Sequence, residues 1–341
     1  MKKGITKILS ACVFAFVVFL AAGTQSKAAV NMGVKQTGAG SSYVDLAWDA
    51  QLGAGHYHTQ FSQDGKNWID MDNSSSPSES VYNLTQGASY YARVVAYKDS
   101  HYMGTHVMVG VSETAIVSTK PTEVSGLTQT AAGVNSVSMS WNASAGAASY
   151  VIYGYINYNW TQIGTSATNS ATITGVAATT STRFSVAAVK NVTGGTVTGD
   201  QCSGVEMKAI PIKVSRIAMQ YYWDSLKEAK YIWTDVNNAD GYQYEVKSAN
   251  GKKTYFRATS TNSYTYVKPF PRGIFVKARV RAYVTVGNKV YYGAWSPYTY
   301  HASSKKVTAK RSSNGKKIYL KWKKVSGASG YQVYVSTKSN G

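Results

Sequence analysis

The chain has 341 residues, a formal net charge of +20 and only two cysteines. So few thiols exclude a small disulfide-framed module, and the folded parts must be stabilised by hydrophobic cores alone. After residue 28 no apolar run reaches the roughly 20 residues of a membrane-spanning helix, so we expect no membrane span beyond that point.

The first 28 residues have the pattern of an export signal. A lysine-rich head precedes an uncharged apolar run over 8–23, and Ser26-Lys27-Ala28 supplies small residues for a signal peptidase. We expect cleavage after Ala28 and a secreted, extracellular protein that can associate with a cell wall. Cys202 is then the only cysteine of the mature chain, and we expect it to be a small apolar residue rather than a reactive thiol.

Four tryptophans recur about 90 residues apart, a period typical of a repeated domain. Each is followed nine residues later by a tyrosine. The pairs are Trp48 and Tyr57, Trp141 and Tyr150, Trp233 and Tyr242, and Trp322 and Tyr331. The chain is therefore predicted to be an array of one module. We expect a signal peptide over 1–28 and modules over 29–120, 121–212, 213–302 and 303–341.

Apolar and polar residues alternate before each tryptophan, as in Val44, Leu46 and Trp48 of the first module. Alternation of this kind predicts a strand with one buried face. The tyrosine begins a second such strand, and Trp68 lies on a third after a turn. The predicted fold class is all-β.

A leucine, Leu84, precedes Tyr90 by six residues late in the first module. With the tryptophan and tyrosine of the earlier strands, this spacing resembles the fibronectin type III family. The resemblance implies tandem immunoglobulin-like antiparallel β-sandwiches, about 90 residues each, and a corner tyrosine whose hydroxyl bonds to nearby backbone. Together with the export signal it favours a secreted bacterial array of such domains. The second module departs from the family pattern, with Val176 and Thr182 at these two positions, and the third lacks the tyrosine.

The fourth module, 303–341, contains residues for the first three strands only. A sandwich without its remaining strands exposes apolar faces and unpaired strand edges. Three explanations remain open: the chain is a truncated part of a longer protein, the half-module is disordered, or another chain completes it by adding strands.

Positive charge is concentrated toward the C-terminal end. The first two modules carry −3 and 0, whereas 213–302 carries +9 and 303–341 carries +10. In the predicted strand over 276–283, Lys277, Arg279 and Arg281 share the outer face. One interpretation is a track that binds an anionic polymer. The other is a solvated face that resists aggregation, with Glu245 on the adjoining strand offsetting part of its charge.

Four of the five histidines lie in the first module, at His56, His58, His101 and His106. The two loops that carry them meet at one end of the resembled sandwich, so the four could converge on a zinc, copper or nickel ion. The alternative is an ordinary polar loop surface.

Tyrosines on the outer faces of the first two modules could stack on sugar rings and bind carbohydrate. They are Tyr91, Tyr97, Tyr153, Tyr155 and Tyr158. The alternative is that tyrosine simply suits the surface of a sheet.

Motifs that indicate catalysis are absent from the sequence, since there is no paired-carboxylate, GxSxG, phosphate-loop or CxxC pattern. We therefore expect no enzyme and no cofactor. The predicted function is a non-catalytic extracellular binding or spacer array, in adhesion or cell-wall association, whose basic end contacts an anionic surface polymer. The alternative is an accessory region, spacer or carbohydrate-binding, of a larger secreted enzyme.

The expected partners are anionic cell-wall or extracellular polysaccharides, such as teichoic acid or glycosaminoglycan, and other surface proteins. Nucleic acid is not expected, because the chain is exported and has no nucleic-acid-reading motif.

Overall fold

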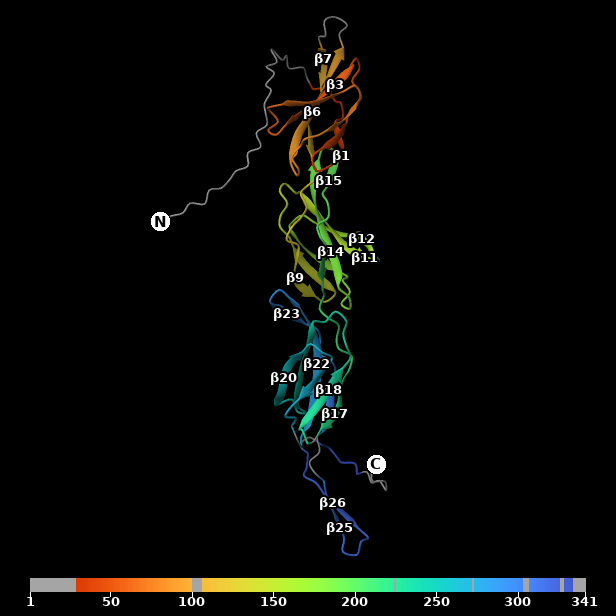
Figure 1. Ribbon diagram of the computed structural model, residues 1–341, viewed down its shortest axis with the longest axis vertical. Coiled ribbons are helices and arrows are strands. Elements are labelled where there is room, and N and C mark those ends of the chain that lie inside the picture. Colours follow the sequence, from red (N-terminus) through yellow and green to blue (C-terminus); the bar gives the residue numbers. More distant parts are fainter. Residues whose placement is uncertain are drawn as a thin grey trace, which may run out of the picture. The chain divides into compact units, whose positions relative to one another are not determined.

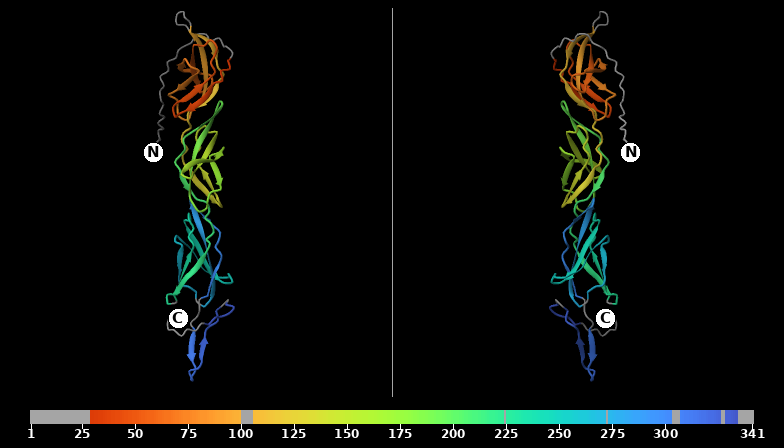
Figure 2. Two further views of the ribbon diagram at one scale, coloured as in Figure 1. Left: turned by 90° about the vertical axis from the view of Figure 1, so that its right-hand side faces the viewer. Right: turned by 90° about the vertical axis from the view of Figure 1, so that its left-hand side faces the viewer.

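The computed structural model describes residues 29–99, 106–223, 225–271, 273–302, 307–325 and 328–333. Within these ranges all the regular elements are β-strands, and the coloured ribbons of Figures 1 and 2 show arrows but no coils. None of these described residues form a helix with the length and apolarity needed to cross a membrane. The all-β prediction is confirmed. The predicted signal peptide, 1–28, and His101 lie outside the described residues.

The described chain divides into two compact units. The first contains 29–35, 46–81 and the described part of 91–115, and the second contains 36–45, 82–90 and the described residues from 116 onward.

The first repeat alternates short strands with turns. Its strands are β1 (Lys35–Ala39), β2 (Val44–Ala47), β3 (His56–Ser62), β4 (Ile69–Ser74), β5 (Ser78–Val81), β6 (Ser89–Asp99), β7 (His106–Val111) and β8 (Ala115–Ser118). They form sheets of order β1-β2-β5 and β4-β3-β6-β7, with β8 also pairing with β6.

The second repeat has the same sequence of elements. Its strands are β9 (Thr128–Gly133), β10 (Ser136–Ser140), β11 (Ser149–Ile156), β12 (Asn159–Ser166), β13 (Ser170–Thr174), β14 (Thr182–Val192), β15 (Gly195–Thr198) and β16 (Val205–Met207). The sheet orders are β9-β10-β13 and β12-β11-β14-β15, with β16 on β14.

The third repeat repeats the scheme once more. Its strands are β17 (Ile217–Trp223), β18 (Glu228–Trp233), β19 (Gly241–Ser248), β20 (Thr254–Ser260), β21 (Tyr264–Val267), β22 (Phe275–Val286), β23 (Lys289–Tyr292) and β24 (Thr299–Ala302). The sheet orders are β17-β18-β21 and β20-β19-β22-β23, with β24 on β22.

Each repeat therefore places its first, second and fifth strands in one sheet and its fourth, third, sixth and seventh in the other. The pairings are antiparallel, as for β19 with β20 and β22. This division of seven consecutive strands is that of an immunoglobulin-like, fibronectin type III sandwich. The first three repeats are therefore tandem sandwiches, as the resemblance implied, and the spacing of the tryptophans indicated their repetition.

The inward faces of the sheets form hydrophobic cores because apolar residues alternate along the strands. The second repeat buries Val137, Met139, Trp141, Tyr150, Ile152, Phe184, Val186, Ala188 and Cys202 in one cluster. The third buries Ala229, Tyr231, Trp233, Tyr242, Tyr244, Val246, Val276, Ala278, Val280 and Ala282. Cys202 is thus a buried residue of the core.

The recurring tryptophan and tyrosine contact each other in every repeat. The ring centroids lie 5.4 Å apart for Trp48–Tyr57, 5.3 Å for Trp141–Tyr150, 5.5 Å for Trp233–Tyr242 and 5.4 Å for Trp322–Tyr331. Each tyrosine hydroxyl also accepts a hydrogen bond from a backbone amide six residues earlier. The donors are Gln51 at 3.0 Å, Ser144 at 3.0 Å, Val236 at 2.8 Å and Val325 at 2.6 Å. The nine-residue spacing therefore fixes both a ring contact and the loop between two strands.

The corner tyrosine of the first repeat lies as the family resemblance implied, with the Thr85 amide donating to the Tyr90 hydroxyl at 3.0 Å. Here the Leu84 amide donates to the Ser42 carbonyl at 2.9 Å. In the second repeat Val176 is buried and donates to the Asn135 carbonyl at 3.0 Å. The backbone contact thus persists where the tyrosine is lost.

The described part of the fourth repeat contains one hairpin, β25 (Thr308–Arg311) with β26 (Ile318–Lys321). Every residue of both strands is exposed. The third strand predicted at Tyr331 is not formed over the described residues 328–333. In the other repeats the equivalent strand pairs with a long sixth strand, and the described part of this repeat has no such partner. The last part of the predicted fourth module, 334–341, lies outside the described residues.

Candidate functional site

The predicted basic track lies on the outer face of the sheet β20-β19-β22-β23. Burial alternates along β22 from Phe275 to Val284, so Val276, Ala278, Val280 and Ala282 face the core. Lys277, Arg279 and Arg281 consequently share the opposite face, as the alternation predicted. We call this surface, with the turn between β19 and β20, the basic face.

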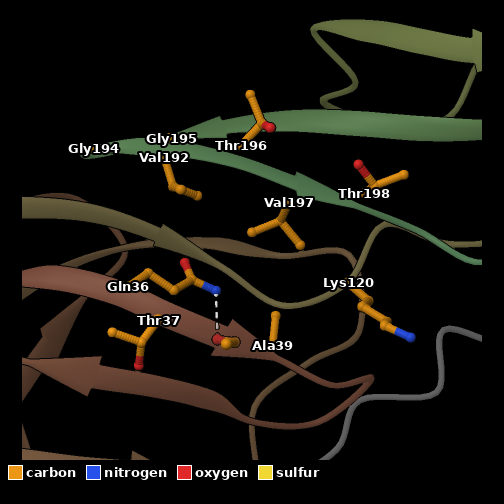
Figure 3. A pocket seen from close by; sticks show the side chains of 11 residues that line it. Gln36, Thr37, Ala39, Lys120, Val192, Gly194, Gly195, Thr196, Val197 and Thr198 are labelled. Atoms are coloured by element: carbon orange, nitrogen blue, oxygen red, sulfur yellow. Dashed lines mark hydrogen bonds between the residues drawn. The ribbon is translucent and has the colours of Figure 1, made fainter.

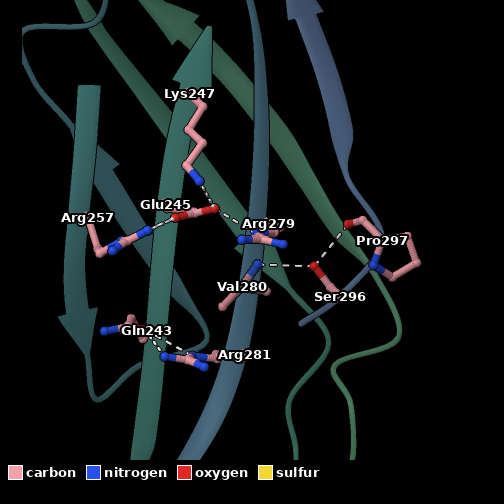
Figure 4. Close-up of polar contacts among 9 residues, drawn as sticks. All are labelled: Gln243, Glu245, Lys247, Arg257, Arg279, Val280, Arg281, Ser296 and Pro297. Carbon is pink, nitrogen blue, oxygen red and sulfur yellow. Dashed lines mark hydrogen bonds and ion pairs between the residues drawn. The ribbon is translucent and has the colours of Figure 1, made fainter. Parts of the chain in front are cut away.

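At the centre of the basic face a single carboxylate is surrounded by cations (Figure 4). The side chain of Glu245 is fully buried, and its oxygens contact Arg257 Nη2 at 2.5 Å, Arg279 Nε at 2.6 Å and Lys247 Nζ at 2.9 Å. Burial alone would raise the pKa of Glu245, but the hydrogen bonds from these three partners outweigh it and lower the pKa to about 2. The cluster therefore holds an ionised carboxylate under a layer of positive charge.

Arg281 is held by an amide rather than by a carboxylate. Its Nε and Nη2 donate to Gln243 Oε1 at 2.9 and 2.6 Å. Beside it the Val280 amide donates to Ser296 Oγ at 3.0 Å, and that hydroxyl donates to the Pro297 carbonyl at 3.0 Å. Figure 4 shows the bond between Val280 and Ser296, which joins β22 to the segment that follows Trp295. The guanidinium of Arg281 is thus fixed in position and keeps its charge.

Aromatic rings alternate with the cations along the basic face. Lys277 lies 4.6 Å and Arg279 4.9 Å from the Tyr298 ring, Arg279 4.4 Å and Arg281 4.5 Å from the Trp295 ring, and Arg281 3.8 Å from the Tyr292 ring. Such contacts contribute about 0.5–1 kcal/mol each at exposed sites. They stabilise the stack of like charges and hold it along the strand.

The basic face has more cations than its carboxylate can neutralise. Among the described residues seven basic side chains lie on the basic face or its turn, and three of them pair with Glu245; the seven are Lys247, Lys252, Lys253, Arg257, Lys277, Arg279 and Arg281. Lys252 and Lys253 are exposed on the turn between β19 and β20 and line a small pocket there with Tyr255 and Phe275. No described carboxylate forms an ion pair with Lys252, Lys253, Lys277 or Arg281, so no acid neutralises the charge of these four side chains.

The histidines of the first repeat also gather, on the outer face of the sheet β4-β3-β6-β7. His56 Nδ1 lies 2.7 Å and His106 Nδ1 3.9 Å from Asp99 Oδ1. The ring of His58 lies 5.4 Å from that of His56, and burial lowers its pKa. The structure thus brings together His56 and His106 of the predicted set and adds Asp99. Sequence alone did not indicate Asp99, since its place beside His56 depends on how β3 and β6 pair.

The tyrosines suggested for sugar binding differ in exposure. Tyr97 is half-buried and stacks on His56 with the rings 5.4 Å apart and 11° from parallel. Tyr155 packs edge-on to Trp160 at 5.3 Å, and Tyr158 is 90% exposed. Carbohydrate binding by these tyrosines stays a prediction.

A larger aromatic surface, which sequence reasoning missed, covers the outer face of β17-β18-β21. Lys230 lies 5.0–5.8 Å above the rings of Tyr264, Tyr266 and Tyr221, and Tyr221 contacts Trp223 at 4.3 Å. The signal was present as alternate aromatic residues on two strands, but their pairing with β18 cannot be read from spacing.

A pocket in the second compact unit is lined by β1, Lys120 and β15 with its preceding turn (Figure 3). Gln36 Nε2 donates to the carbonyl of Gly38 on the same strand at 3.0 Å, and Lys120 is paired with Asp200 at 2.7 Å. Its other lining residues are glycine, threonine, valine and alanine. The lining therefore offers hydrogen bonds but no acid–base or nucleophilic pair.

Comparisons with known proteins assign the chain to no family. No protein-family model matches the sequence, and no curated protein matches it. A solved structure of the FN1–FN3 domains of chicken CNTN1 is similar at 15% identity, covering 80% of this chain and 98% of that chain, with a TM-score of 0.33. The fold assignment rests on the strand order described above.

Proposed function

We propose that the chain is a non-catalytic extracellular binding array whose third repeat holds an anionic surface polymer on the basic face. One observation carries the proposal. Lys252, Lys253, Lys277 and Arg281 have no acidic partner among the described residues, while their neighbours Arg257 and Arg279 are engaged by Glu245.

The arrangement suits a repeating anion better than a small one. Lys277 and Arg281 lie on the same face of β22 and are four residues apart, which spans about 13 Å along a strand. Arg279 lies between them and contacts the same rings, so the positive charges follow one another in a row. A flexible polyanion gains from such a row because each bound phosphate or carboxylate releases counterions.

The setting of the proposed ligand follows from the export pattern at the start of the chain. Outside a cell the polymers that present repeated phosphate or carboxylate groups include teichoic acids, acidic polysaccharides and glycosaminoglycans. The proposed role is adhesion or cell-wall association, in which the other repeats space the basic face from its surroundings.

The test compares two charge-matched variants of the full chain. Lys252→Gln/Lys253→Gln/Lys277→Gln removes three charges from the basic face, and Lys35→Gln/Lys66→Gln/Lys98→Gln removes three from exposed positions of the first repeat. Binding to poly(glycerol phosphate) teichoic acid is measured at low salt, with dextran as the neutral control. We expect the first variant to lose affinity roughly tenfold and the second to lose little. Equal losses would refute the proposal.

A further inference from the structure

We propose that His56, Asp99 and His106 bind one divalent transition metal ion, with Zn²⁺ as the ion of best fit. This site lies in the first repeat, within one compact unit, and is independent of the polymer-binding proposal. Its ligand atoms all lie within 4.8 Å of one another.

Strand pairing explains why these residues meet. His56 pairs with Tyr97 across β3 and β6, and Asp99 pairs with His106 across β6 and β7. Tyr97 and Asp99 are two residues apart in β6, so their side chains are on the same face. Three adjacent strands therefore each supply one ligand to one end of the sheet, and a sheet holds such ligands more firmly than a loop does.

Two of the three ligand separations lie on either side of that expected for a tetrahedral ion, and the third is within 4.8 Å. A metal bonded to nitrogen and oxygen at the lengths usual for zinc keeps its ligand atoms about 3.3 Å apart. Asp99 Oδ1 lies 2.7 Å from His56 Nδ1 and 3.9 Å from His106 Nδ1, on either side of that spacing. Small side-chain rotations would bring both separations to the required value.

One of the three ligand side chains is largely buried, and the other two are exposed to solvent. The His56 side chain is 17% exposed and stacked on Tyr97, whereas Asp99 is 64% and His106 59% exposed. Three protein ligands with an open side leave the fourth position to water or to a group from another molecule.

The donor set selects the class of ion. Two imidazoles and one carboxylate suit zinc, nickel or copper, whereas calcium and magnesium prefer shells made of oxygen atoms. The site differs from the four-histidine set expected from the sequence, since Asp99 supplies a ligand and His58 lies beside the group without joining it.

The test uses isothermal titration of the full chain with ZnCl₂ and, separately, with CaCl₂. The variants are His106→Asn and Asp99→Asn, which change exposed side chains, and the matched control is His58→Asn. We expect one Zn²⁺ per chain, no calcium binding, and a loss of zinc affinity of about tenfold or more in both ligand variants. The His58→Asn variant should bind zinc within about threefold of the parent.

Three results would overturn the site: a parent chain that binds no zinc, zinc binding that persists in Asp99→Asn and His106→Asn, or a loss confined to His58→Asn. Replacing Zn²⁺ by Co²⁺ gives a second readout, because a tetrahedral cobalt spectrum should appear in the parent and in His58→Asn only.

Discussion

The first and third repeats share one arrangement of paired strands, which we call the frame, but they place side chains of different charge at the same position of it. This position is three residues after the recurring tyrosine, Tyr57 or Tyr242. It is Gln60 in the first repeat and Glu245 in the third. Gln60 joins Asp70, at 2.6 Å, to Arg93, at 2.7 Å. Thus an amide there bridges one acid and one base across three strands.

In the third repeat an acid bridges two bases. Glu245 pairs with Arg257 and Arg279 in the register in which Gln60 pairs with Asp70 and Arg93. The second repeat has uncharged Tyr153 at this place. The backbone frame is therefore constant, and the charge of the outer face is set by which side chains occupy three cross-strand positions.

The largest expected effect comes from removing the central acid. Glu245→Gln leaves Arg257, Arg279 and Lys247 facing one another, and breaking a buried ion pair should lower the free energy of unfolding of the third repeat by about 3 kcal/mol. Gln60→Ala in the first repeat removes two hydrogen bonds to charged partners but leaves no fully buried charge, so it should cost less, about 1.5 kcal/mol. Hydrogen exchange of β19 and β3 reads the two repeats separately, and equal losses would contradict the comparison.

Acid should weaken the third repeat through Glu245, and the first repeat also has a carboxylate, Asp64, whose pKa is lowered by hydrogen bonds from Asn67, Lys66 and Ser62. The pKa of Glu245 is lowered from 4.5 to about 2, so its ionisation stabilises the fold fully above pH 4.5 and less as the pH falls toward 2. Between pH 5 and 3 the third repeat should lose about 2 kcal/mol through this group. Hydrogen exchange at both pH values checks this, with Glu245→Gln as the control whose β19 should show a smaller change.

Mutations of the shared frame should, in contrast, have matching effects. Tyr57→Phe and Tyr150→Phe each remove the hydroxyl that accepts a backbone amide bond. We expect a loss of about 1.5 kcal/mol in each repeat, because a part-buried amide loses an acceptor. Denaturant unfolding followed by hydrogen exchange measures both. A loss in only one repeat would show that the frame is not equivalent.

The smallest effect should come from Arg281→Lys. The ammonium keeps the charge but loses the fork to Gln243 and the flat stacking between Tyr292 and Trp295. We expect the third repeat to lose about 1 kcal/mol, while polymer binding at low salt stays close to that of the parent chain. A large loss of binding with unchanged stability would instead indicate recognition by the guanidinium itself.

Much of the frame could be predicted from the sequence, because alternation and the spacing of Trp48 to Tyr57 depend on residues close in the chain. The outer position of Lys277, Arg279 and Arg281 followed from the same periodicity. The partners could not be predicted in this way. Trp295 and Asp99 reach their sites only through pairing between distant strands, and their register is set by bulges and turns rather than by spacing.

The fourth repeat shows which features of the frame local spacing does not determine. Trp322 and Tyr331 contact each other as in the complete repeats, yet no strand forms at Tyr331 over the described residues 328–333. Local spacing is enough for the ring contact, whereas the strand needs a partner.

The most direct test of the central claim is the salt dependence of teichoic acid binding by the full chain. If the basic face supplies the contacts, the slope of log K against log salt concentration should fall by about 2 when Lys252, Lys253 and Lys277 become glutamine, at about 0.7 per lost contact. The matched variant of Lys35, Lys66 and Lys98 should keep the slope of the parent. An unchanged slope in the basic-face variant would contradict the account.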